Sequence, residues 1–566
     1  MDYSKLCEIY EKLSSTTKGL EKTTIIADFL KNIKNEPQTI YLLQGRFVPD
    51  YDEREAGISE QLAIKAISKA TGIKEENVTK EFKKTGELGL VAENFCKNKK
   101  QSHFFSEKLT TQKVLENLRK LPAVEGKGAV DRKMGIIIEL LNSASCIEAK
   151  YIIRTLLGDL KVGIGSGLLR DSIVEFSFSP KDLEEKRRLG DILQSAYDKT
   201  TDFAEVFERA IKGEKELHKV ELSPGKPIKV MLFPKAENIE DAFNIVGKPA
   251  AFEYKYDGFR MMINKDEKGN IEIFTRRLDN VTKQFQDAVK YVKENVKADT
   301  FIIDSEAVGY DPKTKKYRPF QDISQRIRRK YDIEIVEKQL PIELNVFDIV
   351  YYNGKSLINL PFGERRKIIE KIIKIIPYKI RLSEQIITSD EKEAGEFYDK
   401  ALDDGQEGLM AKNLSSIYKP GARIGYAVKL KPDPNELDLV ITGAEYGTGK
   451  RAGWLTSFDV SCRDKSGNLQ EIGKVSTGLK EKEEEGLSFI ELTKELKKLI
   501  ISESGKHVQV KPEIVVMVGY QNIQASPTYN SGFALRFPRM MVMRPDRGIK
   551  DIASLEDVKK AAKKEK

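Results

Sequence analysis

The chain has 566 residues, and its 97 Lys and Arg against 88 Asp and Glu give a formal net charge of +9, which favours a polyanionic partner such as nucleic acid. This length exceeds one ordinary hydrophobic core, so about three domains are expected, and the apolar fraction of 40% excludes a disordered composition. The four cysteines are scattered without a C-x-x-C pair and no apolar run could span a membrane, which excludes a zinc ribbon and a transmembrane protein and favours a reduced, cytoplasmic setting.

The first 222 residues predict an all-α domain of stacked helices. Apolar residues recur there at three- and four-residue spacing, and strand-like alternation is scarce. The N-terminal run 1–13 has the pattern of an amphipathic helix and not of a signal peptide. Further helices are predicted over Glu60–Ala70, Thr111–Lys120, Val130–Asn142 and Cys146–Leu157.

A turn-rich stretch, Leu222–Pro227, predicts a domain boundary. The pattern then changes to that of a mixed α+β domain over residues 223–433. Alternating residues predict strands over Phe252–Tyr256, Arg260–Asn264, Ile271–Arg276, Phe301–Val308 and Leu344–Tyr352. Helices are predicted over Gly363–Ile376 and Lys392–Asp403.

A second boundary is predicted in the stretch Lys431–Asn435, and residues 434–566 are rich in short strand patterns. The predicted strands are Leu437–Tyr446, Ser457–Arg463, Val508–Val518 and Ala534–Arg544, with one helix over Leu487–Ile501. Several strands around one helix favour a small β-barrel of the oligonucleotide-binding (OB) type. The Lys-rich run Ser554–Lys566 predicts a basic C-terminal helix or a frayed tail.

The chemistry of the chain begins at Lys255, which stands two residues before the turn Asp257-Gly258. Free lysine, with a pKa of about 10.4, is charged at neutral pH. Burial and neighbouring cations can lower this pKa and make the amine a nucleophile that attacks phosphorus. The K-x-D-G pattern alone is weak, because it also describes a surface lysine before a β-turn.

The residues after Lys255 supply, in order, the other groups that attack on a nucleoside triphosphate needs. These are cations for the phosphates, carboxylates for a metal and an aromatic surface for the base. Lys429 and Lys431 alternate on a predicted strand, so both ammonium groups are expected to face one anion. The candidates are Arg260, Arg276, Glu306, Phe347, Glu407, Lys412, Arg423, Lys429 and Lys431.

This order resembles motifs I, III, IIIa, IV and V of the nucleotidyltransferase superfamily, which includes DNA ligases, RNA ligases and mRNA-capping enzymes. The matching segments are Lys255–Gly258, Phe274–Arg277, Asp304–Glu306, Glu407–Lys412 and Lys429–Lys431.

Segments outside this core resemble one branch of the superfamily. Ala534–Arg539, with Arg544–Arg547, is similar to motif VI of ATP-dependent DNA ligases. Gly45-Arg46 with Pro49–Glu55, and Leu157–Gly165, look like the N-terminal DNA-binding domain of archaeal and eukaryotic replicative DNA ligases. The resemblance covers nearly the whole chain and implies an archaeal type of enzyme. A composition rich in Lys, Glu and Ile leans to a heat-adapted organism.

The resemblance implies an ATP-dependent DNA ligase that seals 5′-phosphate/3′-hydroxyl nicks through a covalent lysyl-AMP, in replication, repair and recombination, with ATP and Mg²⁺. It implies that Lys255 carries the AMP. It further implies nucleotide contacts from Glu253 and Arg260, ribose and phosphate contacts from Arg276 and Glu306, stacking of Phe347 on adenine, phosphate contacts from Arg423, Lys429 and Lys431, and Mg²⁺ near Glu306 and Glu407.

Other interpretations stay open for several of these residues. Phe347 could be core packing on a buried strand, and either glutamate could be a structural ion-pair partner. An RNA ligase or capping enzyme is the nearest rival function, although about 220 helical residues before the K-x-D-G core favour DNA ligase. A catalytically idle DNA-bridging protein is a rival of another class, and the intact Lys255 and Glu306 speak against it.

Two positions depart from the ligase pattern. Ala427 stands just before the paired lysines, where a tryptophan is usual, and Arg547 ends the last motif in place of a lysine. Guanidinium and ammonium bind phosphate with different geometry, so these departures bear on nucleotide preference and on the roles of the last motifs.

Two segments predict macromolecular contacts, and the protein is expected to be a monomer. Gly158–Gly165, with Lys161 between glycines, permits close approach to DNA phosphate, or else forms a tight turn between helices. Gln101, Phe104 and Phe105 resemble a shortened motif for docking on the sliding clamp PCNA, and local packing is the alternative.

Overall fold

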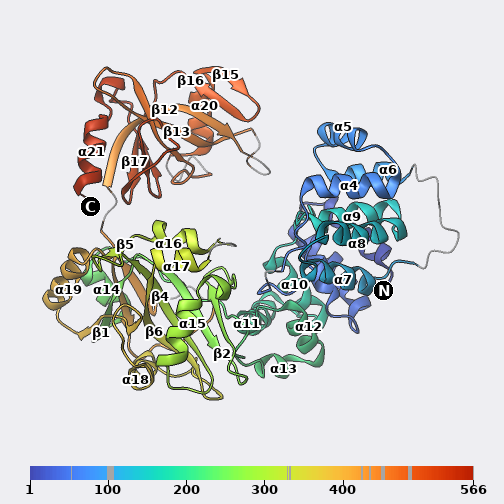
Figure 1. Ribbon diagram of the computed structural model, residues 1–566, viewed down its shortest axis with the longest axis horizontal. Helices are drawn as coiled ribbons and strands as arrows, with labels where there is room; N and C mark the ends of the chain where they lie inside the picture. The colour runs from blue at the N-terminus through green and yellow to red at the C-terminus, as the bar shows by residue number, and fades with distance from the viewer. Residues whose placement is uncertain are drawn as a thin grey trace. The chain divides into compact units, whose positions relative to one another are not determined.

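The structure is a computed structural model. It describes residues 1–564 apart from residues 53, 98–107, 328, 330–332, 422–424, 433–434, 448–450, 452 and 482–486. The chain divides into two compact units, residues 1–431 and 432–566 (Figure 1). No helix in the described ranges is long and apolar enough to cross a membrane.

Residues 1–222, the helical region, contain helices and short 3₁₀ turns around one apolar core that includes Tyr3, Ile26 and Ile152. The helices are α1 (Tyr3–Ser14), α2 (Gly19–Leu30), α3 (Thr39–Leu43), α4 (Glu60–Thr71), α5 (Glu75–Thr85), α6 (Leu88–Cys96), α7 (Thr111–Lys120), α8 (Ala129–Ser143), α9 (Cys146–Leu156), α10 (Ser166–Phe178), α11 (Leu183–Thr200), α12 (Phe203–Lys212) and α13 (Glu214–His218).

Local signals in the sequence set these helix ends. The Ser59 side chain caps the first turn of α4, and Gly72, at φ 72°, ends it in the left-handed conformation that glycine adopts at little cost. Ser145 and Glu148 form a capping box at the start of α9. The helices predicted from periodicity are therefore present, with ends that differ by a residue or so.

Residues 223–431, the central region, contain two β-sheets. The first has the strand order β11-β10-β1-β9, and the second the order β3-β2-β4-β6-β7, with β5 and β8 paired to β4 and β6. The strands are β1 (Ala250–Lys255), β2 (Phe259–Lys265), β3 (Ile271–Thr275), β4 (Phe301–Tyr310), β5 (Tyr317–Arg318), β6 (Ile342–Tyr352), β7 (Lys355–Ser356), β8 (Ile380–Leu382), β9 (Gln385–Thr388), β10 (Gly408–Asn413) and β11 (Ala427–Leu430).

Helices complete the central region, and each sheet has its own apolar core. Phe252 and Leu409 belong to the core beside the first sheet, and Ile303 and Val346 to the core beside the second. The helices are α14 (Ile239–Val246), α15 (Gln286–Asn295), α16 (Phe320–Ile327), α17 (Ile333–Gln339), α18 (Phe362–Ile372) and α19 (Glu391–Asp403). The predicted mixed α+β class is confirmed.

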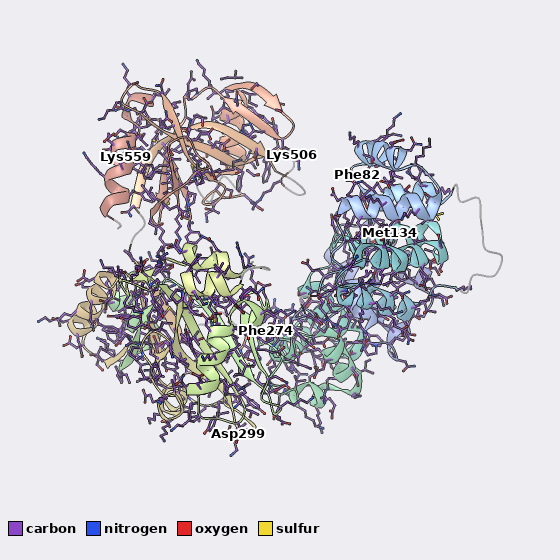
Figure 2. All side chains as sticks on the ribbon, in the orientation of Figure 1. Phe82, Met134, Phe274, Asp299, Lys506 and Lys559 are labelled. Atoms are coloured by element: carbon purple, nitrogen blue, oxygen red, sulfur yellow. The ribbon has the colours of Figure 1, made fainter. Side chains whose placement is uncertain are left out.

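The C-terminal unit is rich in strands that share one core with α20 and α21. Its first strand pairs with β13, β16 and β17 along its length. Charged side chains such as Lys506 and Lys559 project from its surface (Figure 2). The elements are β12 (Asn435–Tyr446), β13 (Leu455–Arg463), β14 (Leu469–Val475), α20 (Phe489–Lys497), β15 (Ile500–Ser504), β16 (His507–Val510), β17 (Val515–Tyr520), β18 (Ile523–Ala525), β19 (Phe533–Leu535), β20 (Arg539–Met543) and α21 (Leu555–Lys564).

Three predicted elements of this unit are wrong in extent. The predicted strand 508–518 is two strands, β16 and β17, because Pro512 cannot donate a ladder hydrogen bond. The predicted strand 534–544 is likewise divided at Phe537, at φ 50°, and Pro538. The predicted helix 487–501 ends at Lys497, and its last residues belong to β15.

Candidate active site

Lys255 is the last residue of β1 and lies opposite Gly408 of β10. The backbone N–H of Glu407 donates to the Lys255 carbonyl oxygen at 2.8 Å, which fixes the start of β10 beside the lysine. The Lys255 ammonium contacts Oε2 of Glu407, and its side chain is 20% exposed. Lys255 is therefore an ordered, mostly buried amine and not a surface lysine on a turn.

A second ammonium shares the Glu407 carboxylate. Lys431 directly follows β11, and its Nζ lies 2.5 Å from the same Oε2. Burial would raise the pKa of Glu407, but Lys255 and Lys431 outweigh it and lower the pKa to about 2. Lys429, opposite Met410, is half-buried on β11.

Two glycines allow the strands to come this close. A Cβ on Gly258 would lie 2.3 Å from the Ala307 carbonyl oxygen and 3.1 Å from Cγ of Glu306. A Cβ on Gly408, at φ 131°, would lie 2.2 Å from the Leu430 carbonyl oxygen. The glycines of the segments 255–258 and 407–412 are thus required by packing around Lys255.

The second sheet brings Glu306 and Arg260 to the same site. They are paired across β4 and β2, and Arg260 is held by Asp304, to which its Nε donates at 2.7 Å. Burial raises the pKa of Glu306 to about 7, although the charges of Lys255 and Arg260 oppose this shift. A carboxyl group that changes protonation near neutral pH therefore stands close to the lysine.

Phe347 lies at a β-bulge in β6. The pairing of β4 with β6 passes from Asp304 opposite Asp348 to Ser305 opposite Val346, so Phe347 has no partner in the ladder. Its side chain is half-buried, and it is absent from the apolar core that holds Val346. A bulge re-aims a side chain, and here it turns the aromatic ring out of the core.

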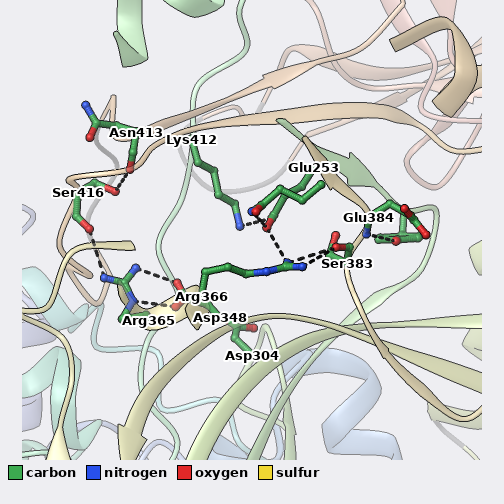
Figure 3. A network of polar contacts seen from close by, with 12 residues as sticks. Glu253, Asp304, Asp348, Arg365, Arg366, Ser383, Glu384, Lys412, Asn413 and Ser416 are labelled. Atoms are coloured by element: carbon green, nitrogen blue, oxygen red, sulfur yellow. Dashed lines mark hydrogen bonds and ion pairs between the residues drawn. The ribbon is translucent and has the colours of Figure 1, made fainter. Parts of the chain in front are cut away.

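A network of buried charges surrounds Glu253 on β1 (Figure 3). Oε2 of Glu253 lies 2.5 Å from the Lys412 ammonium, and Oε1 accepts from Gln385 at 2.8 Å and from Arg366 at 3.4 Å. The Lys412 Nζ also lies 4.6 Å from the ring centroid of Phe347. These contacts fix the position of the Glu253 side chain near Phe347.

Sequence reasoning did not predict the contacts of several residues of this site. Lys412 is a candidate cation at the end of the segment 407–412, but its pairing with Glu253 is not predicted by the sequence, and Arg366 and Gln385 carry no motif. Asp304, which holds Arg260, stands two residues before Glu306, and this spacing places both carboxylates on the same face of β4. That alternation is the one signal that could have identified Asp304.

Within the described part of the chain, the structure shows no contact with the site for the remaining predicted residues. Arg276 is exposed on the turn after β3, and no carboxylate of the described residues pairs with it. Arg423, Gln101, Phe104 and Phe105 lie outside the described residues.

Oxygen ligands for a divalent ion stand beside Lys255. Among the described residues, no group of three or more His, Cys, Asp or Glu side chains could hold a metal. Two carboxylates, those of Glu306 and Glu407, face the lysine and its cationic neighbours. This donor set fits Mg²⁺, which keeps waters and substrate phosphate oxygens in its shell and needs only one or two protein carboxylates.

A buried lysine, cations for phosphate, two carboxylates and an aromatic ring turned out of the core define the central region as a nucleotidyltransferase. Comparison with known proteins agrees with this class. Residues 230–431 match the ATP dependent DNA ligase domain, residues 2–174 the DNA ligase N terminus, and residues 451–547 the ATP dependent DNA ligase C terminal region.

Relatives match over nearly the whole chain. A DNA ligase of Nanoarchaeum equitans is 46% identical over 99% of this chain and 98% of its own length. A DNA ligase of Thermococcus fumicolans is 42% identical over 99% of this chain and 98% of its own. A solved structure, Pmar-Lig_PreS3, has a similar fold, with a TM-score of 0.54 and 17% identity over 95% of this chain and 99% of that one. The chain therefore belongs to the ATP-dependent DNA ligase family, and its activity is the ATP-dependent joining of DNA.

Proposed function

We propose that Lys255 is the nucleophile that receives AMP from ATP and that the enzyme seals nicks in duplex DNA from this lysyl-AMP. The observation that carries the proposal is the contact of the Lys255 ammonium with Glu407, next to Lys431. The contact holds the amine in one position, and the second cation stands where a triphosphate would need positive charge.

The neighbouring residues take distinct parts in nucleotide binding in this proposal. Phe347 stacks on the adenine, and the fixed Glu253 carboxylate accepts a hydrogen bond from the nucleotide. Arg260 contacts the nucleotide from β2, and Arg276, free of an ion pair with any described carboxylate, reaches the ribose and phosphates. The phosphates are held by Arg423, Lys429 and Lys431.

In the first step the neutral Lys255 amine attacks the α-phosphorus of ATP. A nitrogen–phosphorus bond forms, the bond to the β-phosphate oxygen breaks, and pyrophosphate leaves. The proton that Lys255 must lose passes to Glu306, whose pKa of about 7 suits a proton acceptor at neutral pH. Glu407, with Glu306 nearby, would hold Mg²⁺, which would supply charge neutralisation on the phosphates.

The second and third steps use the DNA. AMP moves from Lys255 to the 5′-phosphate at a nick, and the 3′-hydroxyl then attacks that phosphate, so that AMP leaves and the phosphodiester forms. We propose that the helical region holds the duplex through its phosphates, without reading sequence, and that the protein acts as a monomer.

The covalent step is tested with ATP labelled in the α-phosphate. Lys255→Ala is expected to form no labelled adduct. Lys248→Ala is the matched control, because Lys248 is an exposed lysine of the same region that pairs with Glu391 at 2.9 Å, and it is expected to label normally. A covalent adduct in Lys255→Ala at the wild-type level would refute the assignment.

We also propose that the segment holding Gln101, Phe104 and Phe105 docks on the sliding clamp PCNA. Two adjacent phenylalanines in a polar, Lys-rich stretch support this proposal. A pull-down with the cognate clamp is expected to recover the wild-type enzyme and to lose the variant carrying Phe104→Ala and Phe105→Ala. Equal recovery of both would show that the phenylalanines have another role.

A further inference from the structure

A buried amide beside the proposed active site has no hydrogen-bond partner. Asn345, on β6, is 0% exposed, and neither its Nδ2 nor its Oδ1 has a partner in the described part of the chain. Buried polar groups are normally paired, because an unpaired one gives up its hydrogen bonds to water and gains nothing in return. The presence of such a group in a packed strand therefore requires an explanation other than stability.

The side chain of Asn345 faces away from the apolar core of its sheet. Its neighbours along β6, Leu344 and Val346, belong to that core, and side chains alternate along a strand, so Asn345 points to the opposite face. The pairing of β6 with β4 places Asn345 directly opposite Glu306. Directly opposed residues share one face, with Cβ atoms about 5 Å apart, so the amide and the carboxylate are within reach of each other.

Glu306 extends from this face to the proposed nucleophile. A Cβ built on Gly258, in the turn after Lys255, would lie 3.1 Å from Cγ of Glu306, so the glutamate side chain packs against that turn. Among the described residues, none donates a hydrogen bond to the Glu306 carboxylate. A donor that fixed this carboxylate would therefore act directly on the surroundings of Lys255.

A second unpaired group lies on the other side of Asn345. The parallel pairing of β6 with β8 places Arg381 opposite Asn345. The Arg381 guanidinium forms an ion pair with Glu384, but its Nε is buried and has no hydrogen-bond partner in the described ranges. A side-chain amide offers both an acceptor and donors. Oδ1 of Asn345 therefore matches Nε of Arg381, and its Nδ2 matches the Glu306 carboxylate.

We propose that Asn345 is a positioning residue for lysyl-AMP formation. When ATP occupies the site, Oδ1 of Asn345 accepts from Nε of Arg381, and its Nδ2 donates to Glu306 and fixes that carboxylate beside Lys255. Because Asn345 is fully buried, it acts through Glu306 and does not touch the nucleotide. The inference deepens the proposed function and rests on it, since Glu306 must take part in the transfer of AMP to Lys255.

The rate of lysyl-AMP formation at saturating ATP, measured in a single turnover with label in the α-phosphate, tests the inference. Asn345→Leu removes the amide at similar volume, and the loss of a hydrogen bond to a charged group is expected to slow the step about 10- to 100-fold. Asn345→Ala, which adds no bulk, is expected to show the same loss. A wild-type rate in these variants would overturn the proposal.

A double-mutant cycle tests whether Asn345 acts through Glu306. Glu306→Ala removes the partner of the amide, so adding Asn345→Leu to it is expected to change the rate by less than about threefold. Equal slowing by Asn345→Leu with and without the Glu306 carboxylate would overturn the proposal.

Thermal unfolding of the same preparations separates a positioning role from a structural one. An apolar side chain of similar volume in place of an unpaired buried amide is expected to keep Tm or to raise it. Ser356→Ala is the matched control, because Ser356 on β7 carries another buried oxygen that lacks a partner among the described residues, and it is expected to keep both Tm and the rate. A lower Tm in Asn345→Leu would show that the amide stabilises the fold and would overturn the proposal.

Failure of this inference is distinct from failure of the proposed function. A wild-type rate in Asn345→Leu, with no labelled adduct in Lys255→Ala, would refute the role of Asn345 and leave the nucleophile in place. A labelled adduct in Lys255→Ala would refute the nucleophile and this inference with it.

Discussion

The ammonium groups of Lys255 and Lys431 contact the same oxygen, Oε2 of Glu407. One carboxylate thus holds the proposed nucleophile and a proposed phosphate ligand at once. When a triphosphate arrives, its oxygens can compete for Lys431, and this would leave Glu407 with Lys255 alone. The shared oxygen therefore connects nucleotide binding to the contact that holds the Lys255 amine in position.

Glu407→Gln tests this connection. The amide cannot hold two ammonium groups, so Lys255 loses its fixed position, and lysyl-AMP formation is expected to fall by about 100-fold or more. The rate is measured with labelled ATP in a single turnover. Glu391→Gln, which removes a surface partner of Lys248, serves as the control and is expected to keep the rate. A wild-type rate in Glu407→Gln would show that the shared carboxylate is dispensable.

The pH dependence of adenylylation tests Glu306. With a pKa of about 7, raised by burial, its carboxylate form is lost as pH falls below neutrality. The rate of lysyl-AMP formation is therefore expected to rise through pH 7, and Glu306→Gln is expected to be slow and to lose this rise. An unchanged limb near pH 7 in the variant would assign the titration to another group.

Glu306 also gives a stability prediction of definite sign. Its pKa is raised in the folded state, so the unfolded chain loses this proton at lower pH, near 4.5, and the folded protein retains it up to about 7. Stability from this group is thus highest below pH 4.5 and declines as pH rises to 7. Glu306→Gln is expected to raise Tm more at pH 8 than at pH 5, and the reverse order in thermal melts would contradict the cause given.

Much of this architecture is predictable from the sequence because its signals are local. Apolar periodicity located α4, α7, α8 and α9, and alternation located β1, β2 and β6. Elements whose limits depend on a single proline or on pairing with a distant strand, such as β15 to β17, were not predictable from periodicity. The fixed contacts of the site are also long-range: Glu253 meets Arg366 across 113 residues of sequence.

The bulge at Phe347 shows most clearly what could not be predicted from the sequence. Alternation along residues 344–352 cannot tell whether the ring at Phe347 faces the core or the site, because one extra residue in the strand reverses the side. The structure places the bulge at that residue, and this removes the ring from the ladder. A single sequence carries no signal for the bulge.

Phe347→Ala is expected to weaken ATP binding if the ring stacks on adenine. Stacking of a base on an aromatic side chain is worth about 1–3 kcal/mol, so the KM for ATP is expected to rise by roughly 5- to 150-fold. Phe347→Tyr keeps the ring and should remain near the wild type. Phe320→Ala, which removes a half-buried ring outside the proposed site, is the matched control, and an equal effect of both alanine variants would indicate general disruption.

The buried ion pair of Arg365 with Asp348, next to the bulge, is expected to contribute strongly to the stability of the folded protein. Nε of Arg365 donates to Asp348 at 2.7 Å, and the two side chains are 1% and 5% exposed. Asp348→Asn leaves a buried guanidinium without its anion, and it is expected to cost about 3–5 kcal/mol of unfolding free energy. Denaturant titration measures this loss.

The control lies on the same helix, α18, where Glu364 pairs with Lys367 at 2.7 Å on the surface. Glu364→Gln should therefore leave the denaturation midpoint almost unchanged. Equal midpoints for Asp348→Asn and the wild type would mean that the bulge is held by its apolar neighbours and not by this ion pair.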